Sequence, residues 1–216
     1  MARLKVGVLI SGRGSNLQAL IDAAADPAYP AEIALVVSNV AGVQGLDRAG
    51  RAGIPTAVIG HKGFPDRPSF EAALTTALRS AGVAFVCLAG FMRVLTATFV
   101  EAWRDRLINI HPSLLPAFPG LHTHERAIAA GVRFGGCTVH YVRADVDAGP
   151  IIVQAAVPIA PNDTAETLAA RVLEAEHRAF PLALRLIAEG RARVVGDSVR
   201  IPGAVAPAGF ALNPPG

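Results

Sequence analysis

The sequence predicts an α/β protein built around a doubly wound, mostly parallel sheet. Short apolar runs alternate with stretches of helical spacing at intervals of about 25–30 residues, the size of a βαβ unit. The first apolar run ends in a glycine-rich turn, residues 11–16, that opens a helix. Two later runs, 135–142 and 149–159, are separated by so few residues that they must pair antiparallel. The predicted sheet is therefore mixed, in a Rossmann-like fold.

The first half of the chain supplies the parallel strands and their crossover helices. The predicted strands are rich in Val, Ile, Leu and Ala, as strands buried on both faces are, and cover residues 4–10, 32–39, 54–60, 83–91 and 106–111. The predicted helices between them cover residues 17–25, 44–53, 67–82 and 96–103. Ser69 is the expected N-cap of the third helix.

After residue 111 the alternation of strand and helix changes. A loop spaced by prolines precedes the antiparallel pair, and a long helix at 164–189 follows it, with Asp163 as the expected cap. Residues 192–201 predict a terminal hairpin that turns at Gly196 and Asp197. We expect one domain over residues 1–203, followed by a tail rich in Gly, Pro and Ala over 204–216.

Composition and charge narrow the class of function. The chain has 216 residues, is 52% hydrophobic and carries a net charge of +3 that no Lys/Arg cluster concentrates. This balance suits anionic small molecules and gives little support for nucleic acid. No apolar run approaches the roughly 20 residues of a membrane span. Cys87 and Cys137 lie in apolar stretches and are expected to be buried free thiols, so we expect a cytoplasmic protein without nucleic-acid or membrane partners.

The turn "SGRGSN" at 11–16 lies where α/β folds bind phosphate, because a helix N-terminus offers free N–H groups and partial positive charge. Leu17 replaces the third glycine of a dinucleotide motif, and Asn39 stands where that motif needs an acid. The Gly-Lys pair of a P-loop is missing as well. The turn therefore favours a single terminal phosphate. A plain tight turn, capped by Ser15 or Asn16, is the alternative.

Asn109 and His111 end the fifth predicted strand. Residues two apart on a strand point to the same face, so both side chains project together at the carboxyl edge of the sheet, where open α/β folds place ligands. An amide and an imidazole can both donate to an oxyanion that forms on a carbonyl carbon. Pro112 ends the strand. A satisfied core histidine at a strand end is the alternative interpretation.

The link between the two antiparallel strands carries two acids, Asp145 and Asp147. An acid beside a histidine stabilises the charged imidazole and can relay protons, and we assign this role to Asp147. Asp145 is interpreted as a surface turn residue. Neither cysteine neighbours a histidine in sequence, and no serine lies in a nucleophile-elbow motif. These observations favour direct transfer to a carbonyl-type carbon.

Three residues of the proline-spaced loop could suggest a metal site: His122, His124 and Glu125. The His-x-His pair His122 and His124 can chelate, but no third ligand with matching spacing lies nearby, and helix capping or loop packing explains these residues more simply. No metal is expected.

Four segments together resemble the folate-dependent phosphoribosylglycinamide formyltransferases. They are "LISGRGSNLQALIDA", "LAGFMRVL", "NIHPSLLPAFPGLHTHERAI" and "DVDAGPIIVQ", and their order and spacing agree with that family. The resemblance runs from about residue 4 to about residue 203. It implies that residues 1–203 form a formyltransferase catalytic domain. Two small departures from the family pattern, Ala148 for glycine and Cys137 for a smaller residue, touch no catalytic position.

The resemblance implies a reaction and assigns residues to it. A formyl group passes from 10-formyltetrahydrofolate, a co-substrate, to the amine of glycinamide ribonucleotide. The implied catalytic residues are Asn109, His111 and Asp147. The implied ribonucleotide-binding residues are Gly14, Ser15, Asn16 and Glu176. The implied folate-binding residues are Arg67, Met92, Arg93, Val94, Leu95 and Asn109. A monomer or a homodimer is expected.

Other classes remain as alternatives. A methionyl-tRNA formyltransferase is expected to have an arginine-glycine loop after "SLLP" and a further C-terminal domain, whereas this chain has "AFPGLHTH" at 117–124. A formyltetrahydrofolate hydrolase is expected to carry an extra N-terminal domain, and here the first predicted strand begins at residue 4. A non-catalytic nucleotide-binding protein could keep the glycine turn but would have no reason to keep Asn109, His111 and Asp147 together.

Overall fold

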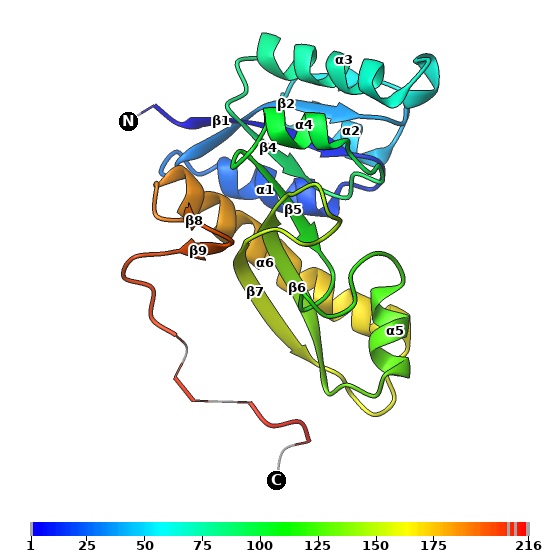
Figure 1. Cartoon of the computed structure of the whole chain (residues 1–216), viewed down its shortest axis with the longest axis vertical. Coiled ribbons are helices and arrows are strands. Elements are labelled where there is room, and N and C mark those ends of the chain that lie inside the picture. The colour runs from blue at the N-terminus through cyan, green and yellow to red at the C-terminus, as the bar shows by residue number, and fades with distance from the viewer. Residues whose placement is uncertain (1, 207, 210, 215–216) are drawn as a thin grey trace.

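The computed structural model describes residues 2–206, 208–209 and 211–214. Its main feature is a seven-stranded sheet (Figure 1). The strands are β1 (Leu4–Ile10), β2 (Ala31–Ser38), β3 (Thr56–Val58), β4 (Phe85–Leu88), β5 (Leu107–His111), β6 (Phe134–Tyr141) and β7 (Ile151–Pro158). Their order across the sheet is β3-β2-β1-β4-β5-β6-β7.

The directions of the strands confirm the predicted mixed sheet. Strands β1 to β5 pair in parallel, whereas β6 pairs antiparallel with both β5 and β7. The chain builds outward from β1 toward β3, and then returns to place β4 on the other side of β1. The boundary between β1 and β4 is therefore the topological switch point, beside which open α/β sheets bind ligands.

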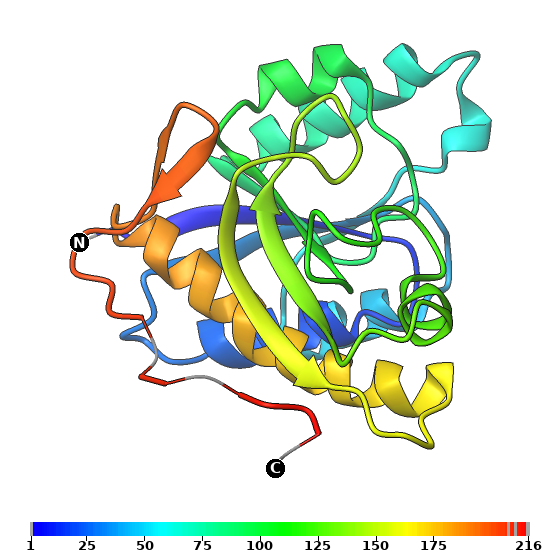
Figure 2. The same cartoon turned by 60° about the horizontal axis from the view of Figure 1, so that its bottom comes forward.

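Helices cover both faces of the sheet. They are α1 (Ser15–Ala24), α2 (Gln44–Arg51), α3 (Arg67–Ser80), α4 (Ala97–Ala102), α5 (Thr123–Ala129) and α6 (Ala165–Ala188), with a short 3-10 helix at His61–Gly63. Helices α1 and α6 pack together on one face, and α3 and α4 cover the other face (Figures 1 and 2). This arrangement leaves the carboxyl ends of the parallel strands available for a site.

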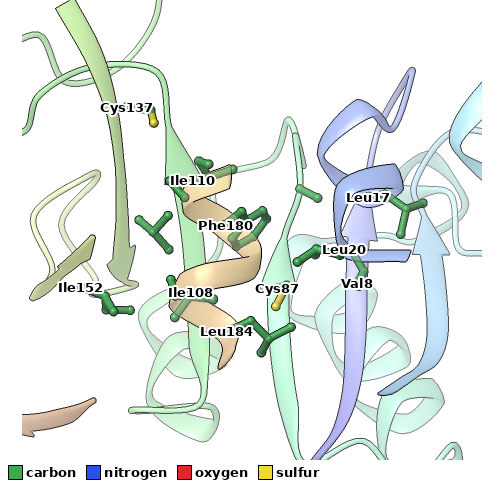
Figure 3. Close-up of a cluster of buried hydrophobic side chains, with 14 of the residues drawn as sticks. Val8, Leu17, Leu20, Cys87, Ile108, Ile110, Cys137, Ile152, Phe180 and Leu184 are labelled. Atoms are coloured by element: carbon green, nitrogen blue, oxygen red, sulfur yellow. The ribbon is translucent and has the colours of Figure 1, made fainter. Parts of the chain in front are cut away.

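The larger hydrophobic core lies between the sheet and helices α1 and α6. Phe180 and Leu20 approach the sheet from the two helices and are fully buried (Figure 3). Ile108 and Ile110 of β5 point into this same core. Because side chains alternate along a strand, Asn109 and its neighbours two residues away point to the opposite face, as the spacing predicts.

Two predicted helix caps are wrong, one by three residues and the other by one. The N-cap of α3 is Asp66, whose carboxylate accepts from the Ser69 backbone N–H at 2.8 Å, so Ser69 lies inside the first turn. The cap of α6 is Thr164, which forms a capping box with Thr167. Asp163 instead forms an ion pair with Arg171. In both cases two neighbouring side chains could cap, and the backbone decides between them.

Other boundaries also differ from the prediction. Strand β4 ends at Leu88 rather than residue 91, because Gly90 turns the chain with a φ of 75°. Strand β3 has three residues, shorter than predicted. Helix α5 was not predicted, because the prolines before it indicated a loop. The predicted terminal hairpin is confirmed as β8 (Arg193–Val195) and β9 (Ser198–Arg200), at the end of α6 (Figure 2).

Both cysteines are buried free thiols, as predicted. Burial raises the pKa of Cys137 to about 12 and that of Cys87 further, so both are protonated and unreactive at neutral pH. Among the described residues, no helix combines the length and the apolar character needed to cross a membrane.

Candidate active site

Asn109 and His111 lie at the carboxyl end of β5, on the face away from α6. The strand ends at His111, directly before Pro112. His111 is buried, and Asn109 is half-buried. The antiparallel neighbour β6 places His140 directly opposite Asn109. The sheet therefore holds one amide and two imidazoles close together at its edge.

His140 fixes the orientation of the Asn109 amide. The His140 Nδ1 lies 2.9 Å from the Tyr141 carbonyl oxygen, which can only accept, so Nδ1 carries a proton. Burial lowers the pKa of His140, which keeps the ring neutral and leaves Nε2 as an acceptor. Nε2 lies 3.3 Å from Asn109 Nδ2 and accepts one of its two N–H groups. The second N–H of Asn109 can serve a substrate.

His111 contacts an acceptor with each ring nitrogen. Its Nδ1 lies 3.3 Å from Asp147 Oδ2, and its Nε2 lies 3.0 Å from the Phe118 carbonyl oxygen. Since carbonyl and carboxylate oxygens both accept, the doubly protonated imidazolium satisfies both contacts. For His111 to donate to a substrate, the Nε2–H must exchange the Phe118 carbonyl for the substrate's oxygen.

Asp147 lies in the link between β6 and β7 and joins three segments. Its Oδ2 accepts from the Gly120 backbone N–H at 2.8 Å as well as facing His111. Its Oδ1 lies 3.8 Å from His140 Nε2. The Asp147 backbone is left-handed, with a φ of 57°, a conformation that aspartate tolerates better than most residues. The side chain therefore faces inward, whereas Asp145 is exposed in the same link.

A cavity of about 740 Å³ opens beside these residues. Its wall includes Asn109, His111, His140 and Asp147, together with the segment 90–95 that follows β4. The lining is largely apolar with a few convergent polar groups, as small-molecule sites are. The predicted folate residues Met92, Arg93, Val94 and Leu95 all line it. Arg67 begins α3, is exposed, and is not among the described residues that line this cavity.

The glycine turn follows β1 and leads into α1. Gly14 is left-handed, with a φ of 70°, and an added Cβ would lie 2.7 Å from the Gly45 Cα of α2. Glycine is therefore required here by the backbone and by the close approach of α2. Within the described chain, no side chain caps the N-terminus of α1, so the proposed capping by Ser15 or Asn16 is wrong. The first amides of α1 are left for another acceptor, and a phosphate would suit them.

Glu176 of α6 lies beside this turn. Its Oε2 accepts from Asn16 Nδ2 at 2.7 Å, so the structure brings together two of the predicted ribonucleotide-binding residues. The side chain is buried, and burial raises the pKa of Glu176 to about 7. A carboxyl group held near its midpoint at neutral pH can accept from an amine or donate to a carbonyl.

Sequence reasoning missed two residues of the site. His140 lies in an apolar strand. Its place in the site can be recognised only once β6 is paired with β5, because the register then sets it opposite Asn109. The Phe118 carbonyl that contacts His111 depends on a left-handed backbone at Phe118, with a φ of 52°. Side-chain patterns do not encode a backbone contact of this kind.

Comparisons with known proteins agree with this geometry. The family model described as "Formyl transferase" matches residues 4–184. The chain is 60% identical over 197 residues to the trifunctional purine biosynthetic protein adenosine-3 of Drosophila pseudoobscura pseudoobscura, covering 90% of this chain but 14% of that protein. It is 43% identical to the phosphoribosylglycinamide formyltransferase of Haemophilus influenzae, covering 94% of this chain and 96% of that enzyme.

A solved structure is similar over nearly the whole chain. The crystal structure of glycinamide ribonucleotide transformylase 1 from Symbiobacterium toebii matches with a TM-score of 0.90 and 49% sequence identity, covering 92% of this chain and 94% of that one. The fold and the polar cluster thus define a formyltransferase. The chain belongs to the phosphoribosylglycinamide formyltransferase family.

Proposed function

We propose that this formyltransferase moves the formyl group of 10-formyltetrahydrofolate to the amine of glycinamide ribonucleotide, in the de novo synthesis of purines. The products are formylglycinamide ribonucleotide and tetrahydrofolate. One observation carries the proposal: Asn109, His111 and Asp147 meet at the wall of a large apolar cavity, on the same edge of the sheet as an uncapped helix N-terminus. A formyl folate suits the cavity, and a phosphate suits the helix.

The first step is attack of the neutral amine on the formyl carbon. A carbon–nitrogen bond forms, and the carbonyl electrons move to oxygen to give a tetrahedral oxyanion. The second N–H of Asn109 donates to this oxyanion, and His111 donates through Nε2 after leaving the Phe118 carbonyl. Donors placed where negative charge develops stabilise the transition state more than the ground state.

The second step is collapse of the tetrahedral intermediate. The attacking nitrogen has gained a positive charge and must lose a proton, while the departing folate nitrogen must gain one. Asp147 lies 3.3 Å from His111 Nδ1 and can accept from it, and through water the carboxylate can pass a proton between the two nitrogens. The carbon–nitrogen bond to the folate then breaks and tetrahydrofolate leaves. The residues present serve each step without a metal.

The remaining assignments follow the two halves of the site. The phosphate of the ribonucleotide would bind at Gly14, Ser15 and Asn16, and its glycinamide end would reach Glu176. The folate ring would lie against residues 92–95, which line the cavity. Arg67 is retained as a candidate for the acidic end of the folate, which would extend beyond the cavity.

We propose a cytoplasmic location, which the two buried free thiols support because free thiols persist in reducing compartments. A monomer or a homodimer stays part of the proposal, with small molecules as the other partners. The pI of about 9.3 fits anionic substrates.

An acceptor panel tests the proposal. The purified chain is incubated with 10-formyltetrahydrofolate and one of three acceptors: glycinamide ribonucleotide, methionyl-tRNA or water alone. We expect tetrahydrofolate to form only with the ribonucleotide, and the Asn109→Ala variant to lose this activity by roughly 10²–10³-fold. Formate released without an acceptor would indicate a hydrolase, and formylated methionyl-tRNA would indicate the other transferase. Either result would overturn the proposal.

A further inference from the structure

Ser11 lies at the topological switch point, between the two halves of the site. It follows β1 directly and precedes the glycine turn that leads to the N-terminus of α1. The segment 90–95 forms a wall of the cavity. It follows β4, which is the strand next to β1 in the sheet. Ser11 is therefore close in sequence to one proposed substrate site and close in space to the other.

Two hydrogen bonds join Ser11 to the cavity wall. The Ser11 backbone N–H donates to the Gly90 carbonyl oxygen at 3.1 Å. The Met92 backbone N–H donates to Ser11 Oγ at 2.8 Å. The second bond uses the serine side chain, so it can be removed without altering the backbone of either strand.

Asn39 sets the direction of the Ser11 hydroxyl. Ser11 Oγ donates its one proton to Asn39 Oδ1 at 2.5 Å, which leaves a lone pair of the oxygen facing the Met92 N–H. Asn39 is buried at the end of β2, so this partner is held firmly. The hydroxyl is thus a fixed acceptor for the cavity wall.

The other end of the same wall is held independently. The carboxylate of Glu71, which is buried on α3, accepts from the Thr96 backbone N–H at 2.8 Å and from the Thr96 hydroxyl. Glu71 does not contact the glycine turn, whereas Ser11 leads into it. Only one of these two anchors therefore connects the cavity wall to the phosphate turn.

We propose that Ser11 is a positioning residue that couples the two substrate sites. Phosphate binding restrains the turn further, and the hydrogen bonds of Ser11 pass this restraint to Met92 and to the wall against which the folate packs. Each substrate then binds more tightly when the other is present, and thermodynamic linkage requires the same factor in both directions. This inference rests on the proposed function, because it takes the ribonucleotide and the folate as the ligands.

The test measures binding in a pair that cannot react. Tetrahydrofolate lacks the formyl group, so calorimetry gives its Kd with and without saturating glycinamide ribonucleotide. For the unaltered chain we expect the ribonucleotide to tighten tetrahydrofolate binding by roughly 5–20-fold, within the usual range of coupling. The reverse titration should give the same factor.

Three variants separate coupling from a general structural role. Ser11→Ala should reduce the factor to less than about two-fold, while Ser11→Thr, which keeps the hydroxyl, should restore most of it. Glu71→Gln loosens the other end of the wall, so it should weaken tetrahydrofolate binding and leave the factor unchanged. Thermal unfolding of each variant checks that the fold is retained.

Two results would overturn the inference. The first is equal Kd values with and without the ribonucleotide in the unaltered chain. The second is an undiminished factor in Ser11→Ala. Failure of the proposed function looks different, because then the unaltered chain would bind neither glycinamide ribonucleotide nor tetrahydrofolate, and this inference would fall with it.

Discussion

Replacing Asp147 with asparagine removes one charge and little else. Asparagine has nearly the same size and also tolerates the left-handed backbone found at this position. Its side-chain oxygen can still accept from the Gly120 N–H, so the contact between the two loops can persist. The charge opposite His111 is lost, in a place where the aspartate side chain is only 10% exposed.

The distance sets the scale of the effect. At the observed 3.3 Å, and with an effective dielectric constant of about 20, the carboxylate and an imidazolium attract by about 5 kcal/mol. The asparagine oxygen still accepts from Nδ1 and recovers part of this energy. A remaining loss of about 3–4 kcal/mol corresponds to a fall in turnover of roughly 10²–10³-fold, since each 1.36 kcal/mol is worth a factor of ten.

The assay follows tetrahydrofolate formation by absorbance at saturating concentrations of both substrates. Asp145→Asn is the matched control, because it removes a charge of the same sign from an exposed position in the same link. We expect the control to keep turnover within about two-fold, since an exposed charge is screened by solvent. If Asp147→Asn retained more than a tenth of normal turnover, formyl transfer would not depend on the Asp147 carboxylate beside His111.

Three further changes test other parts of the site. Ser15→Glu places a carboxylate at the N-terminus of α1, so it should weaken ribonucleotide binding by at least about tenfold and spare tetrahydrofolate, as calorimetry would show. For Glu176 the raised pKa of about 7 means that its stabilising contribution is complete below about pH 4.5 and is lost as the pH rises through 7. Between pH 5 and pH 8 the free energy of unfolding of the unaltered chain should therefore fall by about 2–3 kcal/mol more than that of Glu176→Gln. Urea titrations at each pH measure both, and an equal fall in the two proteins would contradict this. Gly149→Ala puts a Cβ 1.6 Å from the Tyr141 carbonyl oxygen, so it should lower the free energy of unfolding by about 1–3 kcal/mol and reduce turnover by displacing Asp147. Gly50→Ala is the control: an added Cβ there has open space around it and should have neither effect.

Much of the fold follows from hydrophobic spacing alone. Strand β1 was predicted at the residues where it is found, because its apolar run has a turn signal at its end. Antiparallel pairing of β6 and β7 followed from the short link between them. Boundaries were weaker where several residues could serve equally well, as at Asp66 and Ser69, because local hydrogen bonding in three dimensions selects the cap.

The parts of the site that residues close together in the sequence determine could be predicted, and the parts that depend on distant segments were harder to predict. Asn109 and His111 share a face because they are two residues apart on a strand, which the sequence states directly. The approach of Asp147 to His111 depends on a left-handed turn and on close packing at Gly149, and it came from the family resemblance together with the acid-beside-histidine argument. His140 needed the register of β6 against β5, and the long connection at 112–133 does not fix that register as a tight hairpin turn would.

Direct transfer is the central claim, and a single-turnover experiment with a labelled formyl group tests it. The enzyme, in excess, is mixed with glycinamide ribonucleotide and 10-formyltetrahydrofolate carrying ¹³C in the formyl group, then quenched at intervals. Mass spectrometry follows the label on the folate, the ribonucleotide, the protein and free formate. We expect label lost from the folate to appear at once on the ribonucleotide amine, with none on the protein or in formate. Label on the protein before it reaches the ribonucleotide, or label released as formate, would contradict it.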